Sequence, residues 1–319
     1  MGDPSAAASS TSASRPSGAS RPSARASVRS ASPGEAPARA AGLGRAELRE
    51  LARRHGIRPR KALGQHFLAD PNLARAIVAD AGVGSGDRVV EVGAGLGSLT
   101  VALAEAGAAV TAIELDRALL PALREVLAPW PSVRLVHADA LHVRWAELLP
   151  GAGWKMVSNL PYNIAVPLLV RMLEGAPQVV SFLVMVQREV GERLVARAGE
   201  PGYGAPSVRV AYHAEARLVR RVPARVFWPE PAVESVLVRL ERRAAPPVPT
   251  PPDRLSALVE AGFGQRRKTM RAALRRLGLS PAAAEAALAA CGLPADVRAE
   301  RLSLEAFARL ADVVAEEAG

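Results

Sequence analysis

The sequence predicts an α/β, Rossmann-like domain followed by a small, all-helical C-terminal domain. Three observations lead to this prediction. A short apolar strand over 88–92 runs into Gly93, Gly95 and Gly97 and then into a helical pattern. Further apolar strands alternate with helical segments up to about residue 240. Beyond a proline-rich segment, only helical patterns remain.

The glycine-rich stretch after the first strand predicts a nucleotide-type site. Glycines let the backbone approach a ligand closely and adopt φ values that other residues resist. A second strand, 109–113, leads to Glu114, 21 positions after Gly93, a distance at which an acid reaches a ribose diol. Ser98 stands where the dinucleotide pattern has its third glycine. The spacing therefore favours S-adenosylmethionine over NAD or FAD, with a plain tight turn as the alternative.

A third strand, 133–136, is followed by Asp139. An acid directly after a parallel strand lies at the carboxyl edge of the sheet, where ligands bind. Asp139 could accept a hydrogen bond from an adenine amino group, or it could simply cap the next turn. Both interpretations stay open on the sequence alone.

The segment Asn159-Leu160-Pro161-Tyr162, after a strand that starts at Trp154, carries the sharpest chemical indication. An exocyclic adenine amine is a poor nucleophile because its lone pair is delocalised into the ring. The Asn159 side-chain carbonyl and the Leu160 backbone carbonyl could accept its two hydrogens and free that lone pair. Pro161 would fix the turn, and Tyr162 offers a ring on which an extruded base can stack. The alternative is a turn with a packed tyrosine.

Composition limits the remaining classes of function. The net charge is +10, but residues 1–60 hold 11 arginines against 4 acidic residues, so most of it lies near the N-terminus. No apolar run is long enough for a transmembrane helix, and we expect no membrane partner. Cys291 is the only cysteine, which excludes an internal disulfide and favours a reducing, cytoplasmic compartment. No cluster of Cys and His suggests a metal.

The order of segments predicts four parts. Residues 1–43 consist of Ser, Ala, Pro, Gly and Arg and predict a disordered tail. Residues 44–243 form the S-adenosylmethionine-dependent methyltransferase domain, 244–252 a stiff proline linker, and 253–319 a helical RNA-binding domain. Within the first domain we expect helices over 44–56, 71–81 and 118–127, a strand over 179–186, and late strands over 208–214 and 233–240.

Basic residues gather in two places outside the tail. Arg217, Arg220, Arg221 and Arg225 form a run that we interpret as a solvated face, with phosphate contact as the alternative. The second group lies between the expected helices 253–263 and 268–277. Its six positive charges within eleven residues, with no acid among them, favour phosphate contact. We assign RNA binding to Arg266, Arg267, Lys268, Arg271 and Arg275.

Taken together, these segments resemble the ribosomal RNA adenine N6-dimethyltransferases, in particular the small-subunit branch whose loss gives kasugamycin resistance. The resemblance covers about residues 44–315, in family order. Its matching pieces are Gly64-Gln-His-Phe-Leu68, Glu91-Val-Gly-Ala-Gly-Leu-Gly97, Ala112-Ile-Glu-Leu-Asp116, Asp139-Ala, Asn159-Leu-Pro-Tyr162, Phe227-x-Pro-x-Pro-x-Val-x-Ser235 and Phe263-Gly-Gln-Arg-Arg-Lys-Thr269.

The resemblance implies a catalytic turn and a set of cofactor contacts. The catalytic turn is Asn159, Leu160, Pro161 and Tyr162, and the implied S-adenosylmethionine contacts are His66, Leu68, Gly93, Gly95, Glu114, Asp139 and Asn159. His66 stands where the family often has Asn, and Ala94 where it usually has Pro. The implied substrate is a pair of adjacent adenines in a hairpin loop near the 3′ end of small-subunit (16S) rRNA, each taking two methyls. The implied partner is a partly assembled 30S subunit, bound by a monomer.

Three other functions compete with this expectation. A large-subunit rRNA methyltransferase of the macrolide-resistance type shares the glycine loop and the Asn-Leu-Pro-Tyr turn, but the segment 263–269 and the helices after it favour the small-subunit branch. An RNA-binding assembly factor without catalysis is disfavoured because Glu114, Asp139, Asn159 and Tyr162 are all present. An NAD enzyme is disfavoured by Ser98.

Overall fold

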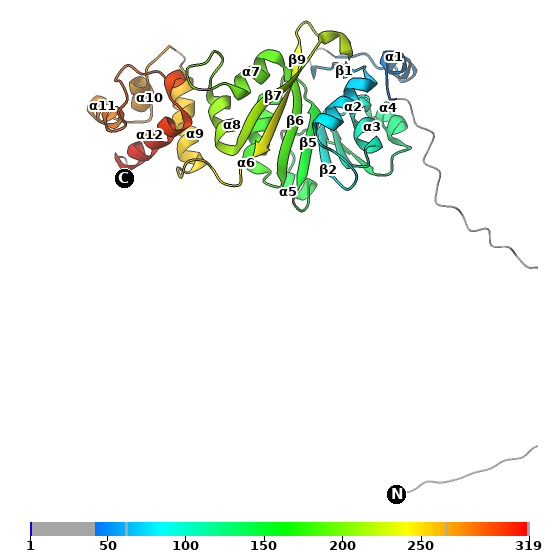
Figure 1. Cartoon of the computed structure of the whole chain (residues 1–319), viewed down its shortest axis with the longest axis horizontal. Helices are drawn as coiled ribbons and strands as arrows, with labels where there is room; N and C mark the ends of the chain where they lie inside the picture. Colours follow the sequence, from blue (N-terminus) through cyan, green and yellow to red (C-terminus); the bar gives the residue numbers. More distant parts are fainter. Residues whose placement is uncertain (2–41, 61–62, 266, 318–319) are drawn as a thin grey trace, which may run out of the picture. The chain divides into compact units, whose positions relative to one another are not determined.

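A seven-stranded sheet lies at the centre of the fold (Figure 1). The computed structural model describes residues 1, 42–60, 63–265 and 267–317, so the predicted disordered tail over 1–43 lies almost entirely outside the described residues. The strands run in the order β4-β3-β2-β5-β6-β9-β7. They are β2 (Arg88–Val92), β3 (Ala109–Glu114), β4 (Val133–His137), β5 (Trp154–Asn159), β6 (Val179–Gln187), β7 (Ala214–Val222) and β9 (Ser235–Arg242). The first five are parallel, and β9 is antiparallel to both β6 and β7.

Alternating side chains of each central strand enter two different cores. Val89 of β2 faces one core, and Val90 and Val92 face the other. This is the period of two that a strand buried on both faces requires. The predicted strands around 88–92, 109–113, 133–136, 154–159 and 179–186 are thereby confirmed, as is the α/β class.

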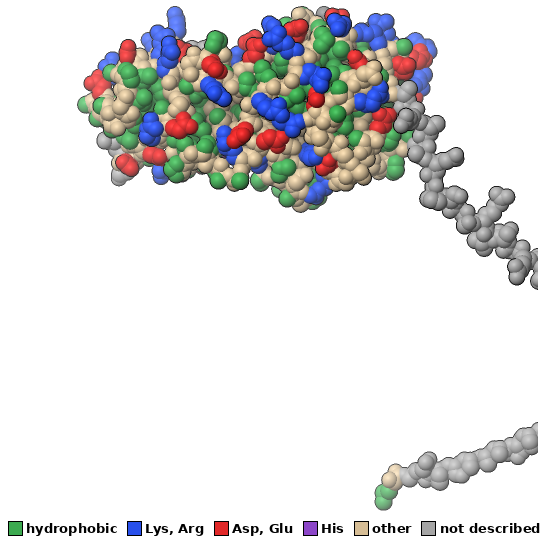
Figure 2. All heavy atoms as spheres, viewed as in Figure 1, with side chains coloured by type: hydrophobic (Ala, Val, Ile, Leu, Met, Phe, Trp, Pro, Cys, Tyr) green, Lys and Arg blue, Asp and Glu red, His purple; other side chains and the backbone are tan. Residues whose placement is uncertain are grey.

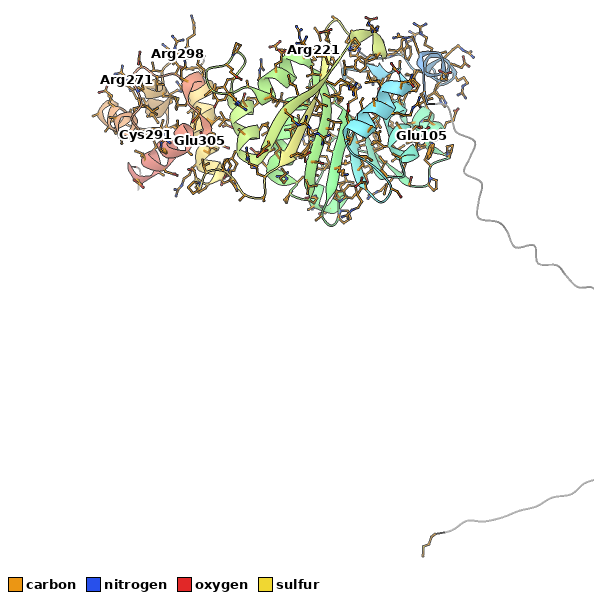
Figure 3. The ribbon with its side chains drawn as sticks, in the orientation of Figure 1. Glu105, Arg221, Arg271, Cys291, Arg298 and Glu305 are labelled. Carbon is orange, nitrogen blue, oxygen red and sulfur yellow. The ribbon has the colours of Figure 1, made fainter. Side chains whose placement is uncertain are left out.

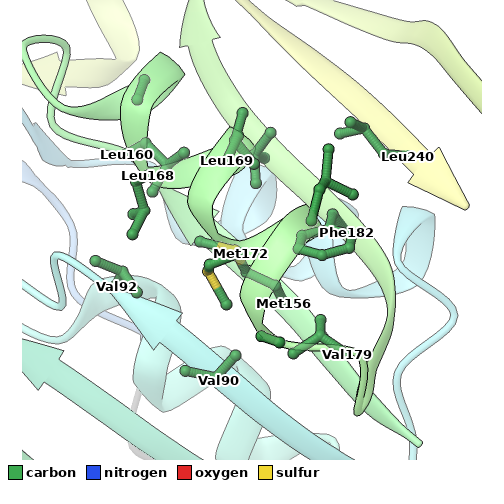
Figure 4. Close-up of a cluster of buried hydrophobic side chains, with 14 of the residues drawn as sticks. Val90, Val92, Met156, Leu160, Leu168, Leu169, Met172, Val179, Phe182 and Leu240 are labelled. Atoms are coloured by element: carbon green, nitrogen blue, oxygen red, sulfur yellow. The ribbon is translucent and has the colours of Figure 1, made fainter. Parts of the chain in front are cut away.

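Helices cover both faces of the sheet. One face carries α2 (Pro71–Asp80), α3 (Ser98–Glu105) and α4 (Leu120–Leu127). The other carries α5 (Trp145–Leu148), α6 (Ala165–Gly175), α7 (Arg188–Val195) and α8 (Ala205–His213). Figure 4 shows how α6 presents Leu168, Leu169 and Met172 to Met156 and Phe182 on the sheet. Each of these five side chains is at most 1 % exposed.

The strand order reverses between β2 and β5, and this reversal locates the ligand edge. From β2 the chain proceeds outward through β3 and β4, then returns to place β5 on the other side of β2. The paired register of β2 and β5 runs from Arg88↔Trp154 to Val90↔Met156. Further along, the Val92 N–H donates to the Ser158 hydroxyl at 2.9 Å instead of to a backbone carbonyl. In open α/β sheets, ligands bind at such a switch point, outside the carboxyl ends of the strands.

A short two-stranded ribbon lies next to the large sheet and connects distant parts of the chain. Its strands are β1 (Phe67–Leu68) and β8 (Phe227–Trp228), paired antiparallel with Phe67 opposite Trp228. Strand β8 follows the 3-10 turn η2 (Ala224–Val226), and Arg45 of α1 (Arg45–Arg54) donates to the carbonyls of Arg225 and Phe227. Phe67 and Leu68 are buried at 5 % and 4 % exposure, so this short strand packs on the core.

The C-terminal part is helical, as predicted. Its elements are α9 (Pro252–Phe263), α10 (Met270–Arg276), α11 (Pro281–Ala290), the 3-10 turn η3 (Ala299–Arg301) and α12 (Leu304–Glu317). Their apolar side chains share one core with Tyr203, Val208 and Tyr212, which precede the proline segment. The proline segment itself is anchored, because the Tyr212 hydroxyl donates to the Thr250 carbonyl at 3.0 Å. The division into a 44–243 domain and a 253–319 domain stays a prediction.

The predicted strand over 208–214 is wrong, because these residues lie mostly in α8. Val208 and Tyr212 pack into the C-terminal core, whereas Val210 packs against the sheet. A helix buried on two sides thus produced the apolar alternation that resembles a strand. The strand comes directly after it, as β7, and carries Arg217, Arg220 and Arg221 on the edge of the sheet.

Candidate active site

A cavity of about 980 Å³, including its open mouth, lies at the carboxyl ends of β2, β3, β4 and β5. All the residues predicted for cofactor binding and catalysis line it. They are His66, Leu68, Gly93, Gly95, Glu114, Asp139, Asn159, Leu160, Pro161 and Tyr162. The sequence prediction therefore selected residues that the fold brings together from positions up to 96 residues apart.

The glycine loop between β2 and α3 forms one wall of the cavity. Gly93 and Gly95 have φ values of +80° and +60°, which residues with a side chain rarely adopt. A Cβ on Gly93 would lie 3.0 Å from the Pro161 ring, and one on Gly95 would lie 2.9 Å from the Phe67 ring. These positions need glycine both for conformation and because the loop packs tightly against the Asn159–Tyr162 turn and β1.

Glu114 ends β3 and is 7 % exposed. Its Oε2 accepts from the Gly95 N–H and its Oε1 from the Asp116 N–H, both at 2.8 Å. Burial raises the pKa of Glu114 above its ordinary value, and these hydrogen bonds act in the opposite direction. The carboxyl group is thus tied to the glycine loop, at the position expected for a ribose ligand.

Asp139 both lines the cavity and caps a turn. Its Oδ1 accepts from the Leu141 N–H at 2.9 Å, and its Oδ2 lies 2.9 Å from Nδ1 of His142. The Leu141 hydrogen bond, followed by that from His142, lowers the pKa of Asp139. The capping role that the sequence left open is therefore present. Nearby, Leu115 also lines the cavity while leaving 51 % of its surface exposed.

At the end of β5, the side-chain amide nitrogen of Asn159 already has a hydrogen-bond partner. Its Nδ2 donates to the His66 carbonyl at 3.0 Å, and Oδ1 has no hydrogen-bond donor among the described residues. Leu160 is held by its N–H, which donates to the Met185 carbonyl at 3.1 Å. Among the described residues, no hydrogen bond to the Leu160 carbonyl is present, so two acceptors of the turn are available together.

Tyr162 is half-buried and held from two sides. Its hydroxyl shares a hydrogen bond of 3.0 Å with the hydroxyl of Ser235, which is fully buried. Its ring stacks with the imidazole of His66, with centroids 5.5 Å apart and planes at 28°. Burial raises the pKa of the Tyr162 phenol, so the group stays neutral at physiological pH.

Two buried polar atoms beneath the glycine loop have no partner within the described part of the chain. They are Oε2 of Glu91 and Oγ of Ser98, and both residues line the cavity. Burial raises the pKa of Glu91 to about 8. Buried polar groups are normally hydrogen-bonded, so this wall of the cavity fits a ligand with polar groups of its own.

The predicted RNA-binding residues lie elsewhere, in α10 and in the segment that leads into it. Arg267, Lys268 and Arg275 are exposed. Arg271, seen in Figure 3, pairs instead with Glu285 at 2.5 Å, and Arg266 lies outside the described residues. Acidic and basic side chains are interspersed on the face drawn in Figure 2. For phosphate binding, the basic residues of this group that lack an acidic partner therefore matter more than the net charge of the chain.

Sequence reasoning did not assign several residues that shape the site. Ser235, the Pro229 carbonyl and Leu115 belong to matching family segments, but nothing in their local pattern predicts a contact with Tyr162, His66 or the cavity. Gln65 is a further case, since its Nε2 donates to Asp116 at 2.8 Å and ties the 63–66 segment to the end of β3.

Two kinds of feature are absent from the described ranges. No group of three or more His, Cys, Asp or Glu side chains there is arranged to hold a metal ion. No helix among the described residues is long and apolar enough to cross a membrane.

The sequence of this chain is similar to a known protein family and to named bacterial proteins. The family model described as "Ribosomal RNA adenine dimethylase" matches residues 56–316. A protein of Streptomyces avermitilis named "Ribosomal RNA small subunit methyltransferase A" is 49 % identical over 282 residues, covering 86 % of this chain and 95 % of the relative. A protein of the same name from Leifsonia xyli is 48 % identical and covers 84 % of this chain and 97 % of its own length.

Solved structures resemble the fold as well. A dimethyladenosine transferase from Plasmodium falciparum superposes with a TM-score of 0.65 at 23 % identity, covering 77 % of this chain and 96 % of its own. A 23S rRNA methyltransferase superposes with a TM-score of 0.60 at 29 % identity, covering 78 % of this chain and 99 % of its own. The first likeness concerns the fold alone.

Proposed function

Because the chain belongs to the ribosomal RNA adenine dimethylase family, we propose that it transfers methyl groups from S-adenosylmethionine to the N6 amines of two adjacent adenines near the 3′ end of small-subunit rRNA. Each adenine would take two methyls. The observation that carries the proposal is the Asn159–Tyr162 turn, which borders the cavity beside the glycine loop with Oδ1 of Asn159 left available. The chain would act as a monomer in the cytoplasm, on a partly assembled 30S subunit.

The lining of the cavity fits S-adenosylmethionine. Glu114 would bind the ribose hydroxyls, Asp139 the adenine amino group, and Leu115 would cover the adenine ring. Glu91 and Ser98 offer buried, unpartnered polar atoms to the amino-acid end. Glycine N–H groups and the backbone of His66 and Leu68 would complete the contacts. The cofactor supplies a methyl group that its sulfonium has already activated.

The catalytic work of the chain is to prepare the target amine. Oδ1 of Asn159 and the Leu160 carbonyl would each accept one N6–H, which draws the nitrogen lone pair out of conjugation with the ring. Tyr162 would stack on the extruded base. These groups are held before the substrate arrives, so little reorganisation is needed, and proximity supplies much of the rate.

The large-subunit alternative is less well supported. The relatives at 47–49 % identity are named for the small subunit, whereas the 23S rRNA methyltransferase is 29 % identical. The test is to incubate the protein with labelled S-adenosylmethionine and unmethylated small or large subunits and to map the label. Label on adjacent adenines of the small subunit is expected, and label confined to the large subunit would overturn the proposal.

Glu114→Ala should weaken S-adenosylmethionine binding at least tenfold. Charge-assisted hydrogen bonds from the ribose contribute roughly 1.5–3 kcal/mol each, and the substitution also releases the Gly95 N–H from its acceptor. Calorimetry measures the dissociation constant, with Glu147→Ala on the exposed side of α5 as the matched control. An unchanged constant for Glu114→Ala would remove the ribose assignment.

We assign binding of the rRNA backbone to residues 253–319 and the chemistry to residues 44–243, with 244–252 as the linker between them. Arg267, Lys268 and Arg275 are exposed cations without an acidic partner among the described residues. Arg266 would act with them, and Arg271 would contribute less while it pairs with Glu285. This separation lets RNA affinity and cofactor affinity be perturbed independently.

Changing Arg267, Lys268 and Arg275 together to alanine should weaken subunit binding and flatten its salt dependence. Each neutralised phosphate contributes about 0.7–0.9 to the slope of log affinity against log salt, so the slope should fall by roughly 2–3. Arg49, Arg124 and Arg134, all exposed, provide a control that removes the same charge elsewhere. If both triple variants lower the slope equally, the C-terminal cluster has no special role.

A further inference from the structure

His66 contacts two side chains of the proposed catalytic turn, those of Asn159 and Tyr162, with different atoms. Its backbone carbonyl accepts from Nδ2 of Asn159 at 3.0 Å. Its imidazole stacks on the ring of Tyr162. His66 thus connects the acceptor for the amine with the platform for the base.

The imidazole is itself fixed by the two-stranded ribbon. His66 immediately precedes β1, and Pro229 immediately follows β8, so the antiparallel register of Phe67 with Trp228 brings the two residues opposite each other. Nδ1 of His66 donates to the Pro229 carbonyl at 2.7 Å. A ring held by one hydrogen bond and one short strand pair has little rotational freedom left.

Tyr162 is therefore clamped by two segments distant from it in the chain. His66 covers its ring from the 63–66 segment, and Ser235 holds its hydroxyl from the start of β9. A stacking platform orients a flexible base only if the platform is fixed first. Aromatic pairs in this geometry contribute enough energy to select one side-chain orientation.

We propose that His66 is a positioning residue for methyl transfer: its imidazole, anchored on the Pro229 carbonyl, holds the Tyr162 ring in the orientation on which the target adenine stacks. The inference rests on the proposed function and adds to it a role on the base side of the site, distinct from the cofactor contact implied by family resemblance. Because the anchor of Asn159 is the His66 backbone carbonyl, a side-chain substitution at His66 removes the contact with Tyr162 and keeps that with Asn159.

The test is a double-mutant cycle in single-turnover methylation of unmethylated small subunits, with the cofactor dissociation constant measured separately. His66→Ala should slow the reaction roughly 3- to 10-fold, the range expected for loss of one aromatic pair, and leave cofactor affinity unchanged. In a Tyr162→Ala background the same substitution should have no further effect, because its target is gone. His66→Phe keeps a ring but cannot donate to the Pro229 carbonyl, so it should restore only part of the rate, whereas His66→Asn, which has no ring to stack on Tyr162, should restore none.

A control cycle uses His137, whose Nε2 lies 3.1 Å from the Leu115 carbonyl on the other side of the cavity. Any effect of His137→Ala should be the same with and without Tyr162. Three results would overturn the inference: equal effects of His66→Ala in both backgrounds, a matching loss of cofactor affinity, or full activity of His66→Asn. Failure of the wild-type protein to methylate the subunit would instead overturn the proposed function, so the two failures are distinguishable.

Discussion

Asn159→Ala is expected to slow methyl transfer about 10²–10³-fold, the usual effect of removing one preorganised polar partner from a site of developing charge. The side chain supplies Oδ1, the acceptor that its own Nδ2, bonded to the His66 carbonyl, leaves available. Cofactor affinity should fall far less, because Glu114, Asp139 and the glycine loop remain. RNA affinity depends mainly on phosphate contacts and should barely change.

Single-turnover methylation with unmethylated small subunits measures this effect, and calorimetry measures cofactor binding separately. Asn72→Ala is a matched control, since that side chain accepts from Arg75 on the exposed surface of α2. A rate for Asn159→Ala within about tenfold of wild type would mean that the Asn-Leu-Pro-Tyr turn is not the catalytic element. The alternatives of a simple packed turn or a non-catalytic assembly factor would then gain support.

Glu91→Gln should make the free energy of unfolding less dependent on pH. Burial raises the pKa of Glu91 from 4.5 to about 8 in the folded protein. Between these values the folded state holds a proton that the unfolded state has released, so the carboxyl lowers stability progressively as pH rises. Glutamine has the same shape and no charge. The stability advantage of the variant should therefore grow by about 4 kcal/mol between pH 5 and pH 8.5.

Urea unfolding at a series of pH values gives the difference directly, because groups that titrate alike in both proteins cancel. Glu105→Gln at the exposed end of α3, labelled in Figure 3, is the control and should track the wild type at every pH. A constant difference between Glu91→Gln and wild type across this range would mean that Glu91 is ionised in the folded protein throughout.

Much of the site was predictable because each of its main motifs is a short continuous segment of the sequence. The glycine loop, Glu114, Asp139 and the Asn159–Tyr162 turn each lie at or just beyond the end of a parallel strand, and parallel strands share one carboxyl edge. Knowing that these strands exist is therefore enough to expect the four groups to meet. The cavity lined by all of them agrees with that expectation.

Contacts between distant segments were not predictable in this way. Tyr162 and Ser235 are 73 positions apart, and His66 and Pro229 are 163 apart. The first contact depends on the long-range pairing of β9 with β6 in the large sheet. The second depends on the β1–β8 pairing, and strands of two residues are too short to leave a periodic pattern. The prediction at α8 was wrong for another reason. This helix is buried on two sides, so its sequence lacks the single apolar face by which a helix is recognised.

The anchored proline segment determines where this chain can be cut. Val248 and Thr250 are buried at 8 % and 1 % exposure, and the Thr250 hydroxyl donates to Asp312 at 2.7 Å. A truncation at residue 243 would leave the apolar side of α8 facing water and invite aggregation. The C-terminal helices alone are consequently unsuitable for transfer into chimeras with other methyltransferases, because they share a core with α8. A donor fragment that begins before α8, near residue 197, would carry its own packing surface with it.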